Sequence, residues 1–512
     1  MKLPIGIQNF ALLREASMVY VDKTMLIAPL LVAGRYFLAR PRRFGKSLLL
    51  STFQAIFNGR KELFAGLWLE NNHDFKPRPV IRIDFSRLDF KERSLEIAIV
   101  DSFAQSALDY GITLQATTAK SAFEELILGL YKLHSERVVV LVDEYDKPIT
   151  DTLFADEQRR INQATLKSVY GVLKPMDEYL HLVFLTGVSK IGKLSLFSDL
   201  NNLQDISLNA KYANLCGYSH EEIVTHFTSY LEAVAEFQGV NLEQLWVSVK
   251  QWYNGYSWDG VHTLYCPFSF LLFLEQQRFK SYWYETGTPT FLMEMIRNAK
   301  LNPFEFDGLE VSESIITATD IERLDPVSLM FQTGYLTIQS IENNPIGTVY
   351  ALAYPNEEVR QAFSSGLLLE YSSLLPFQVN QLGLELQRAL IRLDWQVFFT
   401  AVNRTLAGIP YEIFPRQEVY LHSLVHLMLV STGLRIQSQV QTALGRIDSL
   451  LETQTHFMIF EFKNGGSVEM AWQQITEKEY AKGLVGKPVI GLAVIFDLES
   501  KSITDWKAKI LT

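Results

Sequence analysis

Few cysteines and no long apolar segment set the first limits on this chain. The two cysteines, Cys216 and Cys266, lack the spacing of metal ligands, and their small number indicates a reducing compartment. No apolar run approaches the roughly 18 residues that cross a bilayer, and residues 1–6 do not resemble a signal peptide. We therefore expect a cytoplasmic protein that has no membrane partner.

An excess of positive charge is also missing. The formal net charge is −10 at pH 7, from 47 basic and 57 acidic residues. A chain of this charge has no bulk attraction for nucleic acid, so binding of DNA or RNA would require a locally basic surface. Internal repeats and low-complexity linkers are absent from the sequence as well, which excludes solenoid and fibrous classes.

The length and the hydrophobic pattern predict about three domains. As far as residue 208, short apolar segments alternate with helical stretches, which predicts a parallel sheet with helices on both faces. After this the chain is helical and rich in aromatic residues, and Ser219 has the position of a helix N-cap. The predicted division is an α/β core over 1–215, a helical and connecting region over 216–380, and a third domain over 381–512.

Residues 40–47 (RPRRFGKS) match the phosphate-binding end of a P-loop, G-x-x-x-x-G-K-[ST], without its first glycine. A strand-like segment precedes them and an apolar helix-like segment follows, as a phosphate cradle requires. Lys46 would neutralise phosphate oxygens, and Ser47 would hold Mg²⁺. A basic turn before a helix is the alternative. The expected nucleotide-binding residues here are Arg40, Arg43, Gly45, Lys46 and Ser47, with the arginines facing either phosphates or a neighbouring subunit.

Residues 138–142 (VVVLV) have the pattern of a strand buried on both faces of a parallel sheet. The strand ends in Asp143 and Glu144, at the position where ligands bind in open α/β sheets. Asp143 would contact Mg²⁺ through water, and Glu144 would orient or deprotonate the attacking water. A further strand ends near Thr186 and Ser189, where a hydroxyl could sense the terminal phosphate or could only cap a turn.

A second group of chemical residues lies near the C-terminus. Residues 445–451 and 456–463 predict a strand hairpin that carries Asp448 on the first strand and Glu461 and Lys463 on the second. Alternation places Glu461 and Lys463 on one side and Phe462 on the other. The two carboxylates and the carbonyl of Phe462 are oxygen ligands suited to Mg²⁺, and Lys463 could hold the attacking water. The alternative is an exposed hairpin with a surface salt bridge.

The segment after the hairpin favours the catalytic interpretation. Residues 468–482 predict a helix on which Gln473 and Tyr480 share a face and could contact a phosphate backbone. Arg446, on the first strand of the hairpin, is a third candidate contact to nucleic acid. His422 and His426 have the spacing of metal ligands on a helix, but without an adjacent glutamate we interpret them as packing residues. The aromatic cluster over 252–260 similarly favours packing over base stacking.

With these motifs in view, the chain resembles bacterial and archaeal predicted AAA-ATPase-like proteins fused to a PD-(D/E)XK nuclease domain. The resemblance covers most of the chain, and the arginine-rich, glycine-poor loop is typical of the family. It implies an α/β fold with a P-loop parallel-sheet ATPase domain, a helical lid and an α/β nuclease-like domain. It also implies that Asp448, Glu461 and Lys463 form the nuclease motif. The family often has an acid where this chain has Gln439 and Gln441, and Glu418 could replace it.

We therefore expect an ATP-dependent protein with a Mg²⁺-dependent or Mn²⁺-dependent nuclease, acting on nucleic acid, most simply DNA. The resemblance suggests defence against foreign DNA. A homo-oligomer is compatible with this interpretation, and Arg159 and Arg160 are candidate trans-acting arginines. Two alternatives remain open: a C-terminal domain that binds without cutting, under an ATPase switch, and a P-loop that binds nucleotide without turnover.

Overall fold

The computed structural model divides into two compact units, and each is described by itself. The first comprises residues 1–283 and 308–357, and the second comprises residues 284–307 and 358–512. The structure describes residues 2–198, 200–284, 290–299, 301, 306–345, 347–372, 374–409, 418–442 and 445–511. The three-domain division expected from the sequence remains a prediction.

The first unit contains a parallel five-stranded sheet in the order β2-β3-β4-β1-β5. Its interior strand β3 is buried throughout, as its run of β-branched residues predicts. The order separates β1 from β3 by one strand, so the segments that follow β1, β4 and β3 meet at one edge of the sheet. The strands are β1 (Gly34–Ala39), β2 (Val80–Asp84), β3 (Val138–Asp143), β4 (Leu180–Gly187) and β5 (Gln204–Asp205).

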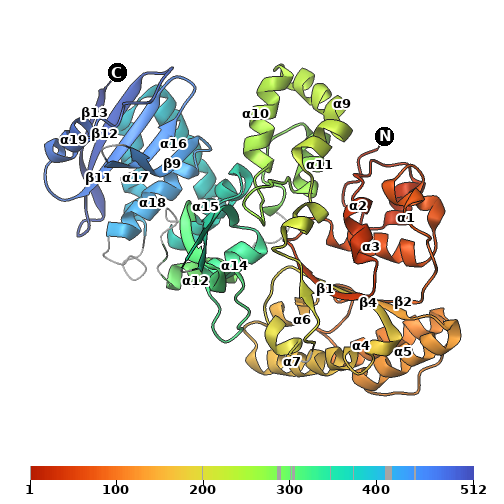
Figure 1. Cartoon of the computed structure of the whole chain (residues 1–512). Helices are drawn as coiled ribbons and strands as arrows, with labels where there is room; N and C mark the ends of the chain where they lie inside the picture. Colours follow the sequence, from red (N-terminus) through yellow and green to blue (C-terminus); the bar gives the residue numbers. More distant parts are fainter. Residues whose placement is uncertain are drawn as a thin grey trace. The chain divides into compact units, whose positions relative to one another are not determined.

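Helices cover both faces of this sheet, with α3 on one side and α4, α5 and α7 on the other (Figure 1). The sequence prediction of a layered α/β domain is confirmed. The longer helices are α3 (Lys46–Phe57), α4 (Leu95–Asp109), α5 (Ala119–His134) and α7 (Asp156–Tyr170). The shorter ones are α1 (Phe10–Glu15), α2 (Thr24–Ile27), α6 (Lys147–Thr150) and α8 (Lys193–Leu196).

A helical segment follows the sheet. It contains α9 (His220–Gln238), α10 (Leu242–Tyr253) and α11 (Pro267–Gln276), which share one apolar core. Ser219 begins α9 with a capping box, because its hydroxyl accepts from the amide of Glu222 and the carboxylate of Glu222 accepts from the amide of Ser219. The predicted N-cap is therefore confirmed.

A small antiparallel sheet completes the first unit, in a region for which no role was predicted. Its order is β6-β8-β7. The strands are β6 (Leu309–Ser312), β7 (Thr337–Asn344) and β8 (Gly347–Ala353), and the helices between them are α13 (Glu313–Ile316) and α14 (Pro326–Thr333).

The second unit is built on a mixed sheet in the order β13-β12-β11-β10-β9, in which β11 and β12 are parallel. The predicted hairpin is confirmed as the antiparallel pair β10 and β11. The strands are β9 (Arg435–Thr442), β10 (Gly445–Glu452), β11 (Phe457–Asn464), β12 (Val489–Asp497) and β13 (Ser502–Ile510). The helices of this unit are α12 (Thr290–Asn298), α15 (Glu357–Ser372), α16 (Pro376–Arg392), α17 (Trp395–Ala407), α18 (Glu418–Val430) and α19 (Val468–Glu477). The first residue of α15 belongs to the first unit.

Two apolar layers sandwich this sheet. Helix α19 packs on one face against a cluster that includes Ile447, Ile459 and Ala493. On the other face, Phe398 of α17 contacts Phe460 with ring centroids 6.0 Å apart. Alternation along β11 therefore places Glu461 on the α19 face, beside Ile459.

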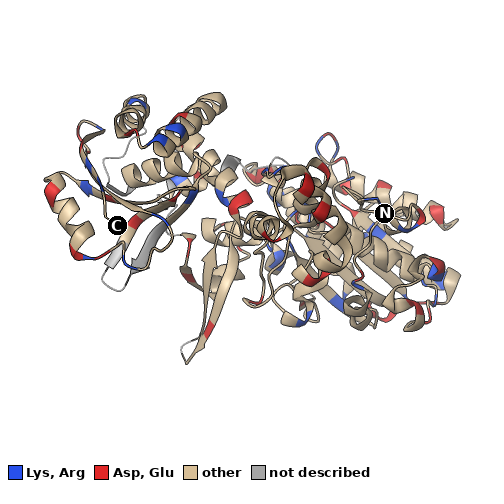
Figure 2. Ribbon diagram, turned by 90° about the horizontal axis from the view of Figure 1, so that it is seen from above, with Lys and Arg blue, Asp and Glu red and all other residues tan. Residues whose placement is uncertain are grey.

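Charged residues of both signs are distributed over the ribbon of both units (Figure 2). This distribution accords with a net charge that is modest for the length of the chain. Among the described residues, no helix has the length and apolar character needed to cross a membrane.

Candidate active sites

The first site is centred on the N-terminus of α3. Gly45 precedes the helix with a φ of 94°, a left-handed conformation that favours glycine, and a Cβ there would meet open space. No side chain of the described residues caps the helix, so these residues leave the amides of its first turn without a side-chain acceptor. Uncapped first-turn amides at a helix N-terminus are suited to bind phosphate. Ser47 is the second residue of this turn.

Lys46 reaches back over the loop that precedes the helix. Its Nζ donates to the carbonyl oxygens of Arg40 and Pro41, at 2.9 Å each. Burial lowers the pKa of Lys46, and the carboxylates of Asp143 and Glu144 act in the opposite direction. A buried ammonium held by carbonyls alone can exchange them for the oxygens of an anionic ligand. The residues present therefore fit a nucleotide phosphate.

Two acids lie at the end of β3, close to this lysine. Asp143 is 1% exposed, and its Oδ1 accepts from Oγ1 of Thr186 at 2.8 Å. Glu144 has a φ of 53°, which turns the chain sharply after the strand. Burial raises the pKa of Glu144, while Lys46 lowers it. The structure thus brings together Lys46, Asp143, Glu144 and Thr186, which sequence reasoning placed in one site.

The second site lies on the α19 face of the C-terminal sheet. Oδ2 of Asp448 accepts from the amide of Phe462 at 2.9 Å, which fixes the acid of β10 against the backbone of β11. Nζ of Lys463 lies 3.2 Å from Oε1 of Glu461. The ladder between the two strands is aligned so that Ser449 pairs with Phe460, and Asp448 is next to Glu461. The structure therefore brings Asp448, Glu461 and Lys463 together.

Glu461 lies in surroundings that favour binding of a cation. Its side chain is buried, and Oε2 has no hydrogen-bond partner among the residues that the structure describes. Burial, and secondarily the charge of Asp448, raises the pKa of Glu461 to about 7, whereas Lys463 lowers it. A divalent cation would satisfy the orphan oxygen and stabilise the ionised form. Among the described residues, no third acid, histidine or cysteine completes a metal-binding group.

Two segments of the chain match models of known protein families. A family model described as "Predicted AAA-ATPase" matches residues 4–197, and a model of the PD-(D/E)XK nuclease superfamily matches residues 416–506. The chain belongs to the AAA-ATPase-like family that carries a C-terminal PD-(D/E)XK nuclease domain. A protein of Azotobacter chroococcum mcd 1, named "Uncharacterized protein in vnfD 5'region", is 36% identical over 526 residues, which cover 100% of this chain and 99% of that protein.

Arg40 was predicted to contact phosphate, but the structure gives its side chain other partners. Its guanidinium is fully buried and donates to the carbonyl oxygens of Ala39, Ser207 and Tyr212. It also stacks on Trp258, with Cζ 4.1 Å from the ring centroid. In this family member, Arg40 holds the loop to a later segment of the chain instead of pointing into the cradle.

The aromatic cluster predicted to serve packing does so beneath the loop. Phe44 contacts the rings of Tyr256 and Trp258, at centroid distances of 4.7 and 5.3 Å. Both partners are buried, so neither ring is available to stack on a base. Arg43 has a φ of 67°, and its guanidinium lies 4.6 Å from the ring centroid of Phe268. The loop is thus packed from behind by the segment that follows α9 and α10.

Asp146 is a residue of the first site that sequence reasoning missed. Its Oδ2 accepts from the amide and the hydroxyl of Ser189, at 2.8 and 2.7 Å, and Oδ1 accepts from the amide of Val188 at 3.2 Å. This carboxylate fixes the end of β4 against the end of β3. The signal was available, because Asp146 is the third acid of the sequence DEYD, three residues after Asp143.

The two candidate trans-acting arginines differ in their surroundings. Arg159 is 3% exposed and forms ion pairs with Asp156 and Glu322, at 2.9 and 3.0 Å. Arg160 is exposed on the same helix. A side chain that reaches a neighbouring subunit must be accessible, which leaves Arg160 as the candidate.

The helix after the hairpin is shorter than predicted. Helix α19 ends at Glu477, and Tyr480 lies in the following turn, 1% exposed. Gln473 is exposed, so the predicted shared face is wrong. Tyr480 instead accepts a hydrogen bond from Gln474 at 3.3 Å. The side chains of Arg446, Gln439, Gln441 and Glu418 lie outside the described residues.

The histidines of α18 pack in the core of the second unit. The ring of His422 lies 5.3 and 5.2 Å from the rings of Phe462 and Phe496. His426 is buried, and burial lowers its pKa to about 3. A neutral ring in such surroundings accords with the packing role inferred from the sequence.

Proposed function

We propose that the protein binds and hydrolyses ATP and that this controls a metal-dependent nuclease that cleaves phosphodiester bonds of nucleic acid. The observation that carries the nuclease half is the buried Oε2 of Glu461, which has no hydrogen-bond partner in the described part of the chain and lies beside Asp448 and Lys463. An isolated buried carboxylate oxygen is costly, and a bound cation would offset that cost. The family models support the two activities in general terms.

Asp448, Glu461 and the carbonyl of Phe462 would hold Mg²⁺ or Mn²⁺. The cation, when bound, would supply a Lewis acid and a water of lowered pKa. Lys463 is 40% exposed at its side chain, and its ammonium is therefore accessible to a phosphate oxygen. In this position it would orient the attacking water and stabilise the negative charge that develops on the phosphate.

In the ATPase half, Lys46 and the amides of α3 would bind the phosphates, and Ser47 and Asp143 would hold Mg²⁺. Glu144 would accept a proton from the attacking water, and its raised pKa favours that role near neutral pH. Thr186 would position Asp143 through the hydrogen bond between their side chains.

A nuclease assay with purified full-length protein tests the proposal. Plasmid, single-stranded DNA and RNA are incubated with Mg²⁺ or Mn²⁺, with and without ATP. Lys463→Ala should abolish cutting and leave ATP hydrolysis intact, whereas Lys46→Ala should abolish hydrolysis and the effect of ATP on cutting. Lys482→Ala, at an exposed lysine paired with Glu479, is the matched control and should cut normally. Cutting that survives in Lys463→Ala would refute the assigned nuclease site.

We take DNA as the substrate and defence against foreign DNA as the role, from the family resemblance. Expression of the protein should then lower the plating efficiency of phage, and Lys463→Ala should restore it. If the purified protein binds DNA and hydrolyses ATP but cuts no substrate with either metal, the chain is instead an ATPase switch with a non-cleaving binding domain.

A further inference from the structure

Strand β2 forms one edge of the ATPase sheet, and β3 is its partner among the described residues. The amide of Phe85 donates to the carbonyl of Asp143. The backbone N–H and C=O groups of the odd-numbered residues of this segment therefore point to β3. Backbone groups of alternate residues in a strand point to opposite sides. The N–H and C=O groups of the even-numbered residues therefore point away from the sheet. These outward residues are Val80, Arg82 and Asp84.

Side-chain and turn contacts occupy both ends of this edge. The hydroxyl of Tyr110 accepts from the amide of Val80 at 3.0 Å and donates to its carbonyl at 3.2 Å, as a neighbouring strand would. The carbonyl of Asp84 accepts from the amide of Arg87 at 3.1 Å. Between them, no hydrogen bond from the described part of the chain fills the outward N–H and C=O of Arg82.

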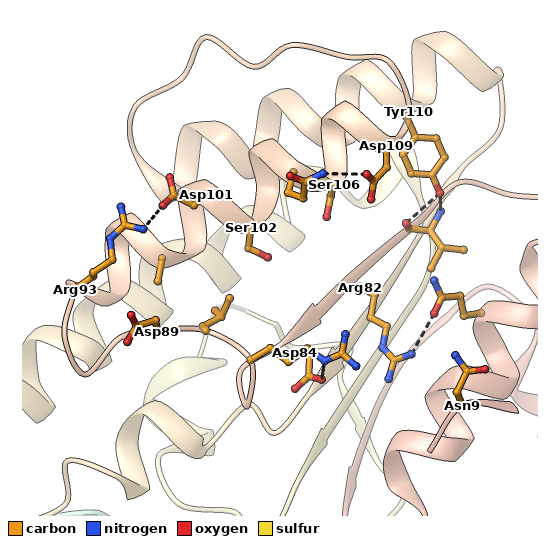
Figure 3. A pocket seen from close by; sticks show the side chains of 16 residues that line it. Asn9, Arg82, Asp84, Asp89, Arg93, Asp101, Ser102, Ser106, Asp109 and Tyr110 are labelled. Carbon is orange, nitrogen blue, oxygen red and sulfur yellow. Dashed lines mark hydrogen bonds and ion pairs between the residues drawn. The ribbon is translucent and has the colours of Figure 1, made fainter. Parts of the chain in front are cut away.

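A cavity of about 790 Å³ lies along this free edge, between β2, α4 and the region of Asn9 and Gln54 (Figure 3). The side chains of Ser102, Ser106 and Asp109 point into it from α4. This volume is within the range of ligand sites in proteins. A trough beside an open strand edge can receive an added strand, whose backbone would satisfy the edge while its side chains enter the trough.

The charge of the cavity indicates what that strand should carry. Two acids of the wall are neutralised locally, in the pairs Arg93–Asp101 and Arg87–Asp84 at 2.7 and 3.2 Å. The third arginine of the wall, Arg82, forms an ion pair with Asp143, in which Nη2 and Oδ2 are 4.0 Å apart. Asp89 and Asp109 form no ion pair with any described residue and leave an excess of negative charge. A basic side chain of the incoming segment would complement them.

We propose that this trough binds an extended segment of a partner protein, which adds as a strand to β2 and places a lysine or arginine near Asp89 and Asp109. The site is separate from both proposed active sites. It is nevertheless connected to the first one, because Arg82 lines the cavity, donates to Oε1 of Gln54 at 3.1 Å and lies beside Asp143. An occupant that moved Arg82 would change the surroundings of Asp143.

The position of Arg82 allows a sharp test. Arg82→Pro removes an outward N–H but no ladder hydrogen bond, and its ring blocks an added strand. Arg82→Ala removes the same guanidinium and keeps the N–H, so the pair separates backbone docking from the side chain. A displayed library of random peptides is selected on the full-length protein, and the enriched peptides are synthesised.

Enriched peptides should carry a basic residue and should bind Arg82→Pro at least about tenfold more weakly than Arg82→Ala. Asp109→Asn should weaken binding of these peptides about threefold. In the wild-type protein, hydrogen exchange should show new protection of the Arg82 and Asp84 amides on binding, and N-methylation of the peptide backbone should abolish binding. The exchange and N-methylation results stand even if Arg82→Pro fails to fold.

Four results would overturn the proposal. One is a selection that yields no peptide protecting these amides. The second is equal binding to the proline and alanine variants when both are folded. The third is a self-association of the chain that Arg82→Pro disrupts, because the edge would then pair with a second copy. Binding of a small anion in place of a peptide would show the cavity to be a different kind of site and would also refute it.

Discussion

The amide of Phe462 donates to Oδ2 of Asp448 at 2.9 Å, so the backbone of β11 fixes the acid of β10 beside Glu461. This contact keeps a second negative charge close to a carboxylate that is already buried. Burial and that charge together hold the pKa of Glu461 at about 7. Two carboxylates this close favour binding of a cation between them. That cation would compete with a proton for the carboxylate of Glu461.

The first prediction concerns this competition. The pKa of Glu461 is raised from 4.5 to about 7, so the folded state holds a proton that the unfolded state releases between those values. The free energy of unfolding should therefore fall as pH rises through this window, by at most about 3 kcal/mol. Glu461→Gln removes the titration and should gain stability relative to wild type as pH rises from about 5 to about 8.

Denaturant unfolding of the wild type and of Glu461→Gln, in the presence of a chelator, measures how their difference in stability changes with pH. Glu477→Gln, at an exposed residue of α19, is the control and should show no comparable trend. Added Mg²⁺ should stabilise the wild type more at about pH 8 than at about pH 6, because the cation needs the ionised carboxylate. A difference between Glu461→Gln and wild type that stays constant with pH would contradict the argument.

The second prediction separates ATP binding from turnover. Glu144→Gln keeps the size of the side chain but cannot accept a proton. We expect nucleotide affinity within about twofold of wild type and turnover lower by about a hundredfold. Binding of a fluorescent ATP analogue and release of phosphate measure the two effects. Glu157→Gln, on the exposed face of α7, is the control, and a Glu144→Gln protein with near-normal turnover would remove Glu144 from the proposed role.

The third prediction concerns the structural role of Arg40. Arg40→Ala leaves three buried carbonyls without their donor and removes the stack on Trp258. We expect a loss of about 2–4 kcal/mol in the free energy of unfolding. Thermal unfolding of Arg40→Ala and of Arg42→Ala, an exposed neighbour in the same loop, measures the contrast. Equal stability of the two variants would show that the buried contacts contribute little.

Much of the ATPase-like unit follows from local sequence patterns. A buried β-branched run predicted β3, and the acids directly after it had to lie at the ligand edge of a parallel sheet. The function of Arg40 could not be predicted in this way. Its acceptors Ser207 and Tyr212 lie about 170 residues downstream, and the sequence contains no signal for that long-range contact.

The C-terminal site, too, was predictable from the sequence only in part. Alternation along one strand was sufficient to place Glu461 and Lys463 together. The end of α19 was predicted wrongly because apolar spacing continues past it, while the backbone turns at Glu479, which has a φ of 44°. The burial of Tyr480 follows from that turn and depends on tertiary packing that periodicity does not encode.

The last prediction concerns Thr186, whose hydroxyl donates to Asp143 at 2.8 Å and also contacts the carbonyl of Val142 at 3.2 Å. Thr186→Val is nearly isosteric and removes the donor, which leaves a buried carboxylate less well oriented. We expect a cost of about 1–2 kcal/mol in stability and a rise in the Mg²⁺ concentration needed for half-maximal ATP turnover. Thr186→Ser keeps the hydroxyl and should restore the Mg²⁺ requirement. If the serine variant needs as much Mg²⁺ as the valine variant, the hydroxyl alone does not restore the site, and the hydrogen bond to Asp143 does not account for the Mg²⁺ requirement.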